Sequence, residues 1–101
     1  MNQLIFYVNE KQLYAGIPLY EWLLEEAKRA GVHGGSVFRA IAGFGRHQRL
    51  HEETFFELAG ELAIKVEFIL DELSAEKLMD RVCAQNLKIF YVRVLVDAGF
   101  V

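Results

Sequence analysis

Residues 62–70 read LAIKVEFIL, and their strict alternation predicts the β-strand around which the rest of the chain is organised. Charged Lys65 and Glu67 fall on one side of an extended chain. The apolar residues fall on the other: Leu62, Ile64, Val66, Phe68 and Leu70. Such a strand is buried on one face only, which is typical of an antiparallel sheet covered by helices on one side.

Downstream, a helix and a strand are expected. Ser74 is a suitable N-cap for the helix. Its apolar face would carry Ala75, Leu78, Met79, Val82 and Cys83, so Cys83 is predicted to lie in the core. The final strand is predicted at residues 88–96, KIFYVRVLV.

Upstream, residues 36–43 are predicted as a strand, residues 18–30 as a helix and residues 3–9 as a strand. Pro18 suits the first helical position, and Gly31 follows where a left-handed cap is expected. The order is β-α-β-β-α-β. We expect an α+β fold of the ferredoxin-like type, with both helices on one face of an antiparallel sheet. With one Pro and no linker-like stretch, residues 1–101 are expected to form one domain.

The other face of the sheet is predicted to mix apolar and charged side chains. The expected set is Ile5 or Tyr7, Arg39, Ile41, Lys65, Glu67, Tyr91, Arg93 and Leu95. Hydrophobic residues make up 53% of the chain. We therefore expect copies of the chain to pack on this face, with charges paired across subunits. The alternative is a solvated face with scattered apolar residues.

Composition excludes several functions. The net charge is −3 and the pI is about 5.6, so no basic field attracts nucleic acid. Cys83 is the single cysteine, which excludes an internal disulfide and CxxC metal sites. No stretch is predicted to insert into a membrane. The N-terminus lacks the pattern of a secretory signal, and we expect a cytoplasmic protein.

The segment RAIAGFGRHQRLH, residues 39–51, concentrates cations around two glycines. Gly43 and Gly45 allow positive φ angles and a close approach of a ligand to backbone N–H groups. Arginine adds forked donors that suit phosphate or carboxylate. The pattern indicates either an anion-binding turn or a hairpin loop whose arginines pair with the glutamates that follow.

At these residues the chain resembles the PII signal-transduction proteins. GFGR at 43–46, His51, AIKVEFI at 63–69 and AQNLKIFYV at 84–92 are similar to the second-strand, T-loop and last-strand segments of that family. The resemblance is sharper to an uncharacterised PII-like branch. That branch carries PLYE, here Pro18–Glu21, and a G-x-(S/T)-V-x-R-x-I-x-G-F-G run that ends here at Gly45.

The resemblance implies a non-enzymatic regulator. It would be a homotrimer that binds an adenine nucleotide (AMP, ADP, ATP or a cyclic form), or another small anion, between subunits. The resemblance assigns the ligand contacts to Gly43, Phe44, Gly45, Arg46 and Lys88, and Arg49 of the same cationic segment is a further candidate for the phosphate contact. A loop bearing His47, His51, Phe55 and Phe56 would contact a target protein, by analogy a membrane transporter.

Two departures from the PII pattern stand out. Only Asn86–Leu87 are expected between the last helix and strand, so a glycine-rich phosphate loop is predicted to be missing. Segment 46–60 contains no tyrosine that could be modified. A monophosphate or cyclic nucleotide is therefore as suitable a ligand as a triphosphate.

Three alternatives stay open. A small ferredoxin-like enzyme of the oxygenase or isomerase type could use His33 or Tyr91 in a cavity. An adaptor could bind proteins through Phe55 and Phe56 without a ligand. His47 and His51 have a spacing that could hold a metal on a helix, but they are expected in a loop as surface or ligand-contacting residues. Trp22 is either a packing residue or an interface anchor.

Overall fold

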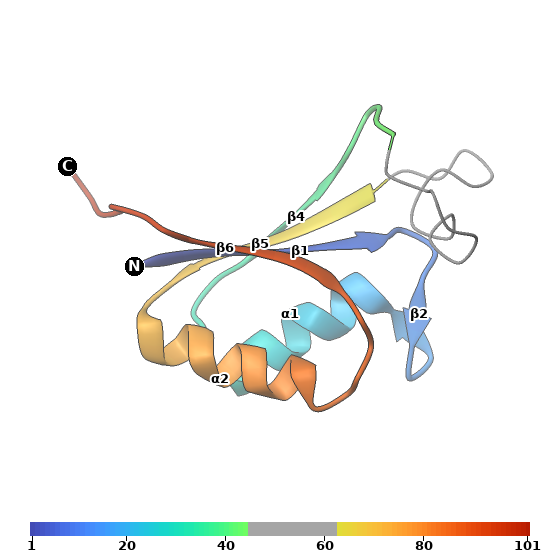
Figure 1. Cartoon of the computed structure of the whole chain (residues 1–101), viewed down its shortest axis with the longest axis horizontal. Coiled ribbons are helices and arrows are strands. Elements are labelled where there is room, and N and C mark those ends of the chain that lie inside the picture. Colours follow the sequence, from blue (N-terminus) through green and yellow to red (C-terminus); the bar gives the residue numbers. More distant parts are fainter. Residues whose placement is uncertain (45–62) are drawn as a thin grey trace.

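The computed structural model describes residues 1–44 and 63–101, which form a four-stranded antiparallel sheet with helices over one face (Figure 1). The strand order is β4-β5-β1-β6. The elements of this sandwich are β1 (Asn2–Asn9), α1 (Leu19–Arg29), β4 (Ser36–Arg39), β5 (Ala63–Leu70), α2 (Glu72–Cys83) and β6 (Phe90–Leu95). The predicted β-α-β-β-α-β order and ferredoxin-like fold are confirmed. Neither helix in the described part of the chain has the length and apolarity needed to cross a membrane.

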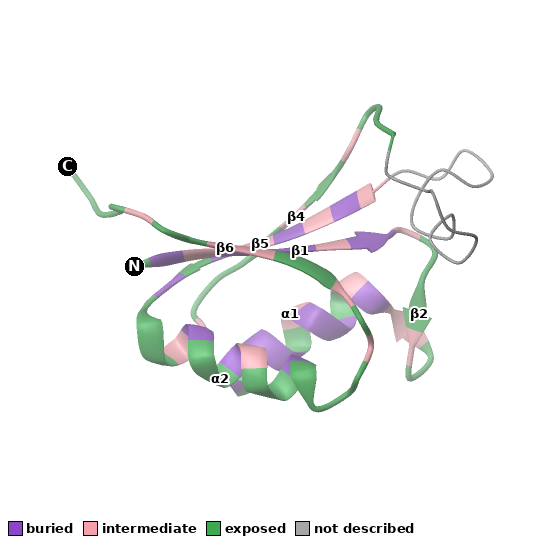
Figure 2. Ribbon diagram, in the orientation of Figure 1, coloured by how far each residue is buried: buried purple, intermediate pink, exposed green. Residues whose placement is uncertain are grey.

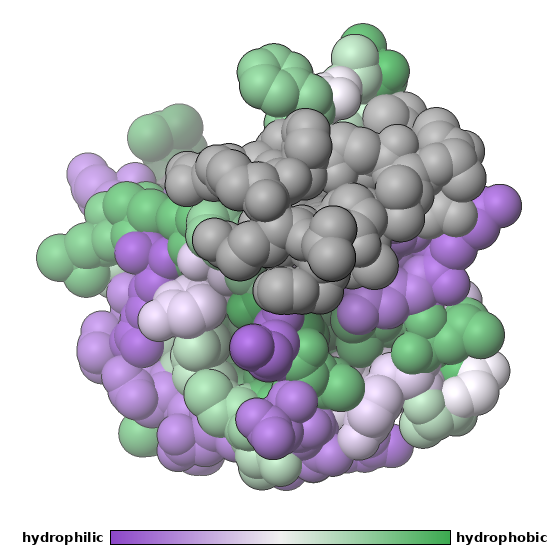
Figure 3. All heavy atoms as spheres, turned by 45° about the vertical axis from the view of Figure 1, so that its right-hand side comes forward, coloured by the Kyte–Doolittle hydropathy of each residue, from purple (hydrophilic) through white to green (hydrophobic). Residues whose placement is uncertain are grey.

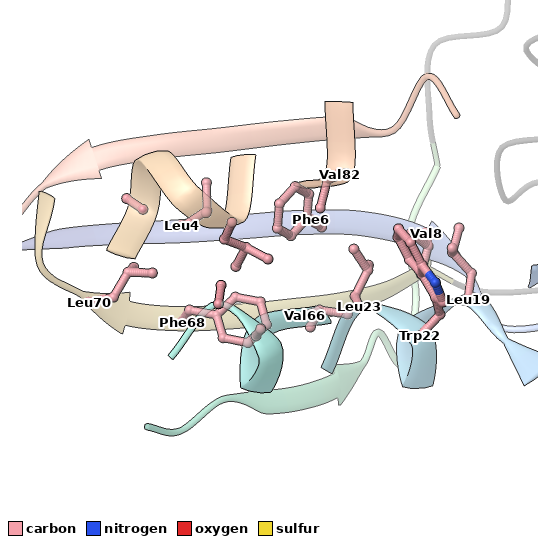
Figure 4. Close-up of a cluster of buried hydrophobic side chains, with 14 of the residues drawn as sticks. Leu4, Phe6, Val8, Leu19, Trp22, Leu23, Val66, Phe68, Leu70 and Val82 are labelled. Atoms are coloured by element: carbon pink, nitrogen blue, oxygen red, sulfur yellow. The ribbon is translucent and has the colours of Figure 1, made fainter. Parts of the chain in front are cut away.

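The core lies between the sheet and the helices. Figure 2 shows buried residues concentrated on the inner strands β1 and β5 and on the sides of the helices that meet them. The predicted alternation of β5 is confirmed, because Ile64, Val66 and Phe68 are buried whereas Lys65 is only half-buried. Phe68 meets Phe6 edge to face, with ring centroids 6.4 Å apart. Trp22 is buried among these residues and is therefore a packing residue (Figure 4).

The ends of the helices differ from the sequence-based expectation. Pro18 is the N-cap of α1, one position before the first helical residue, and Gly31 adopts the expected positive φ of 87°. Asp71, not Ser74, caps α2: its carboxylate accepts a hydrogen bond from the Ser74 backbone N–H at 2.7 Å. Cys83 is exposed because it is the last residue of α2, beyond the apolar side of the helix.

The strand register corrects the predicted open face, meaning the sheet face opposite to the one that α1 and α2 cover. Ile5 pairs with both Glu67 and Val92, so Val92 shares the open face with Phe90 and Val94. Tyr91, Arg93 and Leu95 therefore lie on the helix side, opposite to the prediction. The reason is visible at Arg93, whose guanidinium contacts Glu72 and Glu76 on α2 at 3.0 Å each.

The same correction applies to β4, which is shorter than predicted. Phe38 pairs with Lys65 and lies on the open face, with the Lys65 ammonium 5.0 Å from its ring centroid. Arg39 lies on the helix side and pairs with Glu10. Ile41 follows the end of β4 and is almost fully exposed.

A short hairpin and a longer loop were not predicted. The hairpin consists of β2 (Leu13–Tyr14) and β3 (Ile17–Pro18), joined by Ala15 and Gly16 at φ angles of 54° and 85°. Two positive φ angles are the requirement of a tight two-residue hairpin turn. The loop spans residues 84–89, because α2 ends at Cys83 and β6 begins only at Phe90.

Candidate functional site

The predicted ligand residues that the structure describes gather at one end of the sheet. β1 ends there, and the pairs Asn9–Ala63, Tyr7–Phe90 and Arg39–Ile64 bring the start of β5, the start of β6 and the end of β4 to the same edge. Gly43 and Phe44 follow β4, and Lys88 precedes β6. This end lies at the right of Figure 1 and comes forward in Figure 3, where hydrophobic side chains reach the surface among hydrophilic ones.

Within one chain, however, these residues belong to opposite margins of the sheet. β4 and β6 are its two outer strands, with β5 and β1 between them. Three strand spacings amount to about 14 Å, so one phosphate group cannot contact both margins. The structure therefore brings Gly43 and Lys88 to the same end without bringing them into one contact.

The segment that follows β4 stands away from the sheet. The Ala40 N–H donates to the Ala63 carbonyl oxygen at 2.9 Å, and the pairing ends there. Phe44 is almost fully exposed. Gly43 does not adopt the positive φ expected of it, and within residues 1–44 and 63–101 no heavy atom beyond its chain neighbours lies within 4 Å of the position a Cβ would take. Gly43 is exposed.

The remaining predicted site residues lie outside the described parts of the chain. They are Gly45, Arg46 and Arg49 of the ligand set, and His47, His51, Phe55 and Phe56 of the partner loop. Their roles stay predictions.

Loop 84–89 contradicts the expectation that only two residues separate α2 from the last strand. It contains two non-glycine residues in the left-handed region, Asn86 at φ 56° and Lys88 at φ 59°. Asparagine tolerates this conformation, whereas for lysine it costs about 1–2 kcal/mol. Leu87 and Ile89 pack against the core on either side of Lys88 and hold the loop in this shape. Backbone strain of this kind is concentrated at functional sites.

The charges around this end leave Lys88 available. Arg39 is engaged by Glu10 at 2.6 Å, and this hydrogen bond raises the pKa of the Arg39 guanidinium above its ordinary value. Lys88 is exposed and forms no ion pair with any residue in 1–44 or 63–101. Within the described part of the predicted ligand set, Lys88 is the residue that can neutralise an anion.

Sequence reasoning missed the contact that borders this loop. The Tyr14 hydroxyl on β2 donates to Oε1 of Gln85, the second residue of the loop, at 2.6 Å. The Tyr14 ring meets Trp22 edge to face, with centroids 4.9 Å apart. The available signal was the pair Ala15–Gly16 between apolar residues, which is weaker than the Asn-Gly pattern of most tight hairpins.

A cavity of about 320 Å³ lies elsewhere, between α1 and the segment leading into β4. His33 lines it, together with Leu24, Val32 and Phe68. Tyr91 is not among its lining residues; it lies on β6, the outer strand farthest from β4. The two residues considered for an enzymatic role therefore do not share a site.

Comparisons with known proteins agree with this fold. The family model DUF190, described as "Uncharacterized ACR", matches residues 1–92. The "UPF0166 protein" of Aquifex aeolicus (strain VF5) is 34% identical over 76 residues, which cover 75% of this chain and 72% of that protein.

Among solved structures, the chain is similar to the crystal structure of a candidate PII-like signalling protein from Thermus thermophilus. The TM-score is 0.57 at 19% sequence identity, covering 92% of this chain and 81% of the other. At this identity the similarity establishes a common fold.

Proposed function

The chain belongs to the DUF190 family and has a PII-like fold, and on this premise we propose that it is a non-enzymatic regulatory protein that binds an adenine nucleotide between the subunits of a homotrimer. Fold alone does not establish a ligand, so the support has to come from the residues at the end of the sheet.

The observation that carries the proposal is the conformation of Lys88. An exposed lysine without an ion pair among the described residues is held at φ 59°, at the sheet end where the glycine-rich segment begins. A chain without a function for this lysine gains stability from a residue that fits the conformation, such as glycine. An anionic ligand that contacts the ammonium group supplies a reason for the strain.

The position of the site between subunits is supported by the two margins of the sheet. Gly43 follows one outer strand and Lys88 precedes the other, so a neighbouring copy that places its margin alongside completes a cleft. The open face supplies the surface for such packing. Its large apolar residues are partly or mainly exposed in the single chain: Phe38, Ile69, Phe90 and Val94.

The charges on the open face do not oppose its burial. Glu67 accepts a hydrogen bond from the Gln3 amide at 2.6 Å and lies 3.6 Å from the Lys65 ammonium. These groups are paired within one chain, and the pairing of charges across subunits stays a prediction. Burying the face therefore leaves no unpaired charge, which is the costly case.

In this proposal Arg46 and Arg49 contact the phosphate, and the backbone of Gly43 and Gly45 donates hydrogen bonds to it. Binding orders the loop 44–57, which contacts a target protein through His47, His51, Phe55 and Phe56. Such order–disorder switching needs only a local electrostatic contact. The protein would act in the cytoplasm, and the PII resemblance suggests a membrane transporter as the target.

The test is calorimetry of the purified protein with ATP, ADP, AMP and cyclic AMP. We expect binding of at least one nucleotide, and Arg46→Ala should weaken it at least tenfold, about 1.4 kcal/mol. Lys77→Ala is the matched control, because Lys77 is an exposed cation on α2 outside the predicted ligand set. The absence of heat with millimolar concentrations of all four nucleotides would refute the proposal.

A further inference from the structure

The β2–β3 hairpin is attached to the loop that carries Lys88. Tyr14 reaches from the hairpin to Gln85, a residue 71 positions later in the chain, and donates the hydrogen bond of 2.6 Å. On its other side the Tyr14 ring packs edge to face against buried Trp22. The hairpin is thus held by the core and holds the loop through one hydroxyl group.

Gln85 is well placed to transmit this constraint. Its backbone N–H donates to the Val82 carbonyl oxygen at 3.1 Å, and the Asn86 N–H donates to the Cys83 carbonyl oxygen at 3.0 Å. These bonds continue the last turn of α2. The chain then enters the left-handed positions at Asn86 and Lys88, one and three residues after Gln85.

We propose that Tyr14 is a positioning residue, which through its hydrogen bond to Gln85 holds residues 84–89 in the conformation that presents Lys88 to the anionic ligand. The proposal rests on the proposed function for the role of Lys88. The physical basis is that two free energies are of similar size. One side-chain hydrogen bond stabilises the fold by about as much as a lysine in the left-handed backbone conformation costs, so losing the bond allows the loop to relax.

The test uses Tyr14→Phe, which removes the hydroxyl and keeps the ring against Trp22. Tyr20→Phe is the matched control, since the Tyr20 hydroxyl forms no hydrogen bond with any residue in the described ranges. Amide hydrogen exchange of the full chain is measured by mass spectrometry. We expect exchange in residues 84–89 to accelerate at least fivefold in Tyr14→Phe, with an unchanged thermal midpoint, and to stay at the parent rate in Tyr20→Phe.

Variants of the acceptor separate positioning from packing. Gln85→Leu should accelerate exchange in the loop as Tyr14→Phe does, and the double variant should be no faster than either single one. Gln85→Glu keeps an oxygen that can accept the Tyr14 hydrogen bond, so exchange in the loop should stay at the parent rate. Trp22 is the only tryptophan of the chain, so its fluorescence also reports whether the hairpin moves.

The second measurement is the affinity for ATP, followed by calorimetry. Where the parent protein binds ATP, Tyr14→Phe should weaken binding about fivefold and Tyr20→Phe should not. If the parent binds none of ATP, ADP, AMP and cyclic AMP, the proposed function fails, and the exchange experiment alone decides whether Tyr14 holds the loop; if it binds one of the others, that nucleotide replaces ATP in this measurement. Unchanged exchange in Tyr14→Phe, uniformly faster exchange with a lower thermal midpoint, or unchanged affinity beside a binding parent would each overturn the inference.

Discussion

Lys88 has a conformation that opposes stability and a charge that suits an anion, and substitutions can separate the two. Lys88→Gly removes the strain and the charge together. Relief of about 1–2 kcal/mol of strain exceeds the extra backbone entropy that glycine loses on folding, so the free energy of unfolding should rise by up to about 1 kcal/mol. Affinity for ATP should fall about tenfold, as measured by calorimetry.

Lys88→Gln is the matched variant, because it removes the charge and keeps the strained backbone. We expect the same loss of affinity without the gain in stability, measured by urea unfolding. Unchanged affinity in both variants would remove Lys88 from the ligand site.

The helix cap at Asp71 gives a prediction for pH. Hydrogen bonds from Ser74, first from its backbone N–H and then from its side chain, hold the pKa of the Asp71 carboxyl below its ordinary value. A carboxyl with a lowered folded-state pKa stabilises the fold above the unfolded-state pKa, about 3.9, and loses that contribution as the pH falls through the folded-state pKa. Asp71→Asn keeps an oxygen acceptor but cannot ionise.

We therefore expect Asp71→Asn to be less stable than the parent at pH 7, with a difference that shrinks as the pH falls below the unfolded-state pKa. Urea unfolding at several pH values measures the difference. Glu72, whose carboxyl pKa is also lowered by Asn2 and Arg93, keeps part of the pH dependence in both proteins. Parallel stability curves across this range would show that the charge of Asp71 contributes nothing.

At the scale of elements, the strands differ in whether their own sequence is enough to predict which face is buried. In β5 the apolar residues Ile64, Val66 and Phe68 alternate with Lys65 and Glu67, so its buried face could be predicted. In β6 both faces carry apolar residues. Arg93 decides which face points toward the helices, because it contacts Glu72 and Glu76 on α2. That choice depends on a tertiary contact, so periodicity alone gave the wrong face for Tyr91.

In the loops at the candidate site, too, the sequence pattern alone does not predict the backbone. Lys88 and Ile89 precede an apolar run and are strand-like in sequence, yet the chain passes through left-handed conformations at Asn86 and Lys88 before β6 begins. The sequence placed Gly43 at the end of the second main strand and Lys88 at the start of the last one, whereas β4 ends at Arg39 and β6 begins at Phe90. It did not predict the Tyr14–Gln85 contact, because the hairpin that makes it has strands of two residues each.

The connection between α1 and β4 requires a glycine at Gly35. A Cβ at this position would lie 2.4 Å from Cε1 of Phe68, which is buried and packed edge to face against Phe6. Gly35→Ala should therefore destabilise the protein by about 1–3 kcal/mol, the usual cost of overpacking. The measurement is chemical unfolding with the slope held common between variants.

Gly34→Ala is the matched control for this prediction. Among the described residues beyond its chain neighbours, no heavy atom lies within 4 Å of the position its Cβ would take, and its φ is not in the left-handed region. Its stability should stay within about 0.5 kcal/mol of the parent, as for an exposed substitution. Equal stability of the two variants would mean that the segment before β4 moves away from Phe68 without cost.

At the scale of the whole molecule, the two faces of the sheet are unequal. The residues on the helix side pack into the core, and Figure 2 shows where buried and exposed residues lie along the strands. The open face exposes four large apolar residues in the single chain: Phe38, Ile69, Phe90 and Val94. Lys65, Tyr7 and Gln3 lie between these residues in the register, and the exposure of four large apolar side chains on one face still favours an interaction surface. Because Lys65 and Glu67 pair with each other within one chain, burying this surface leaves neither of these two charges without a partner.

If copies of the chain pack through this face, an added charge on it should separate them. Ile69 is on the inner strand β5, opposite Gln3, and is 43% exposed. In Ile69→Lys the ammonium group reaches solvent in a single chain, whereas in an assembly it is buried near Glu67, which Lys65 already engages, and burying this added charge is unfavourable. Light scattering should show about 35 kDa for the parent, three chains of 11.6 kDa, and a monomer for the variant.

Leu73→Lys is the control, because Leu73 is an exposed apolar residue on α2, away from the open face. It should keep the mass of the parent. The monomeric Ile69→Lys variant should keep its helical circular dichroism but lose nucleotide binding, because the two margins that carry Gly43 and Lys88 then no longer meet across a subunit boundary. A monomeric variant that still bound ATP with the parent's affinity would place the ligand within one chain and require a different partner for Lys88.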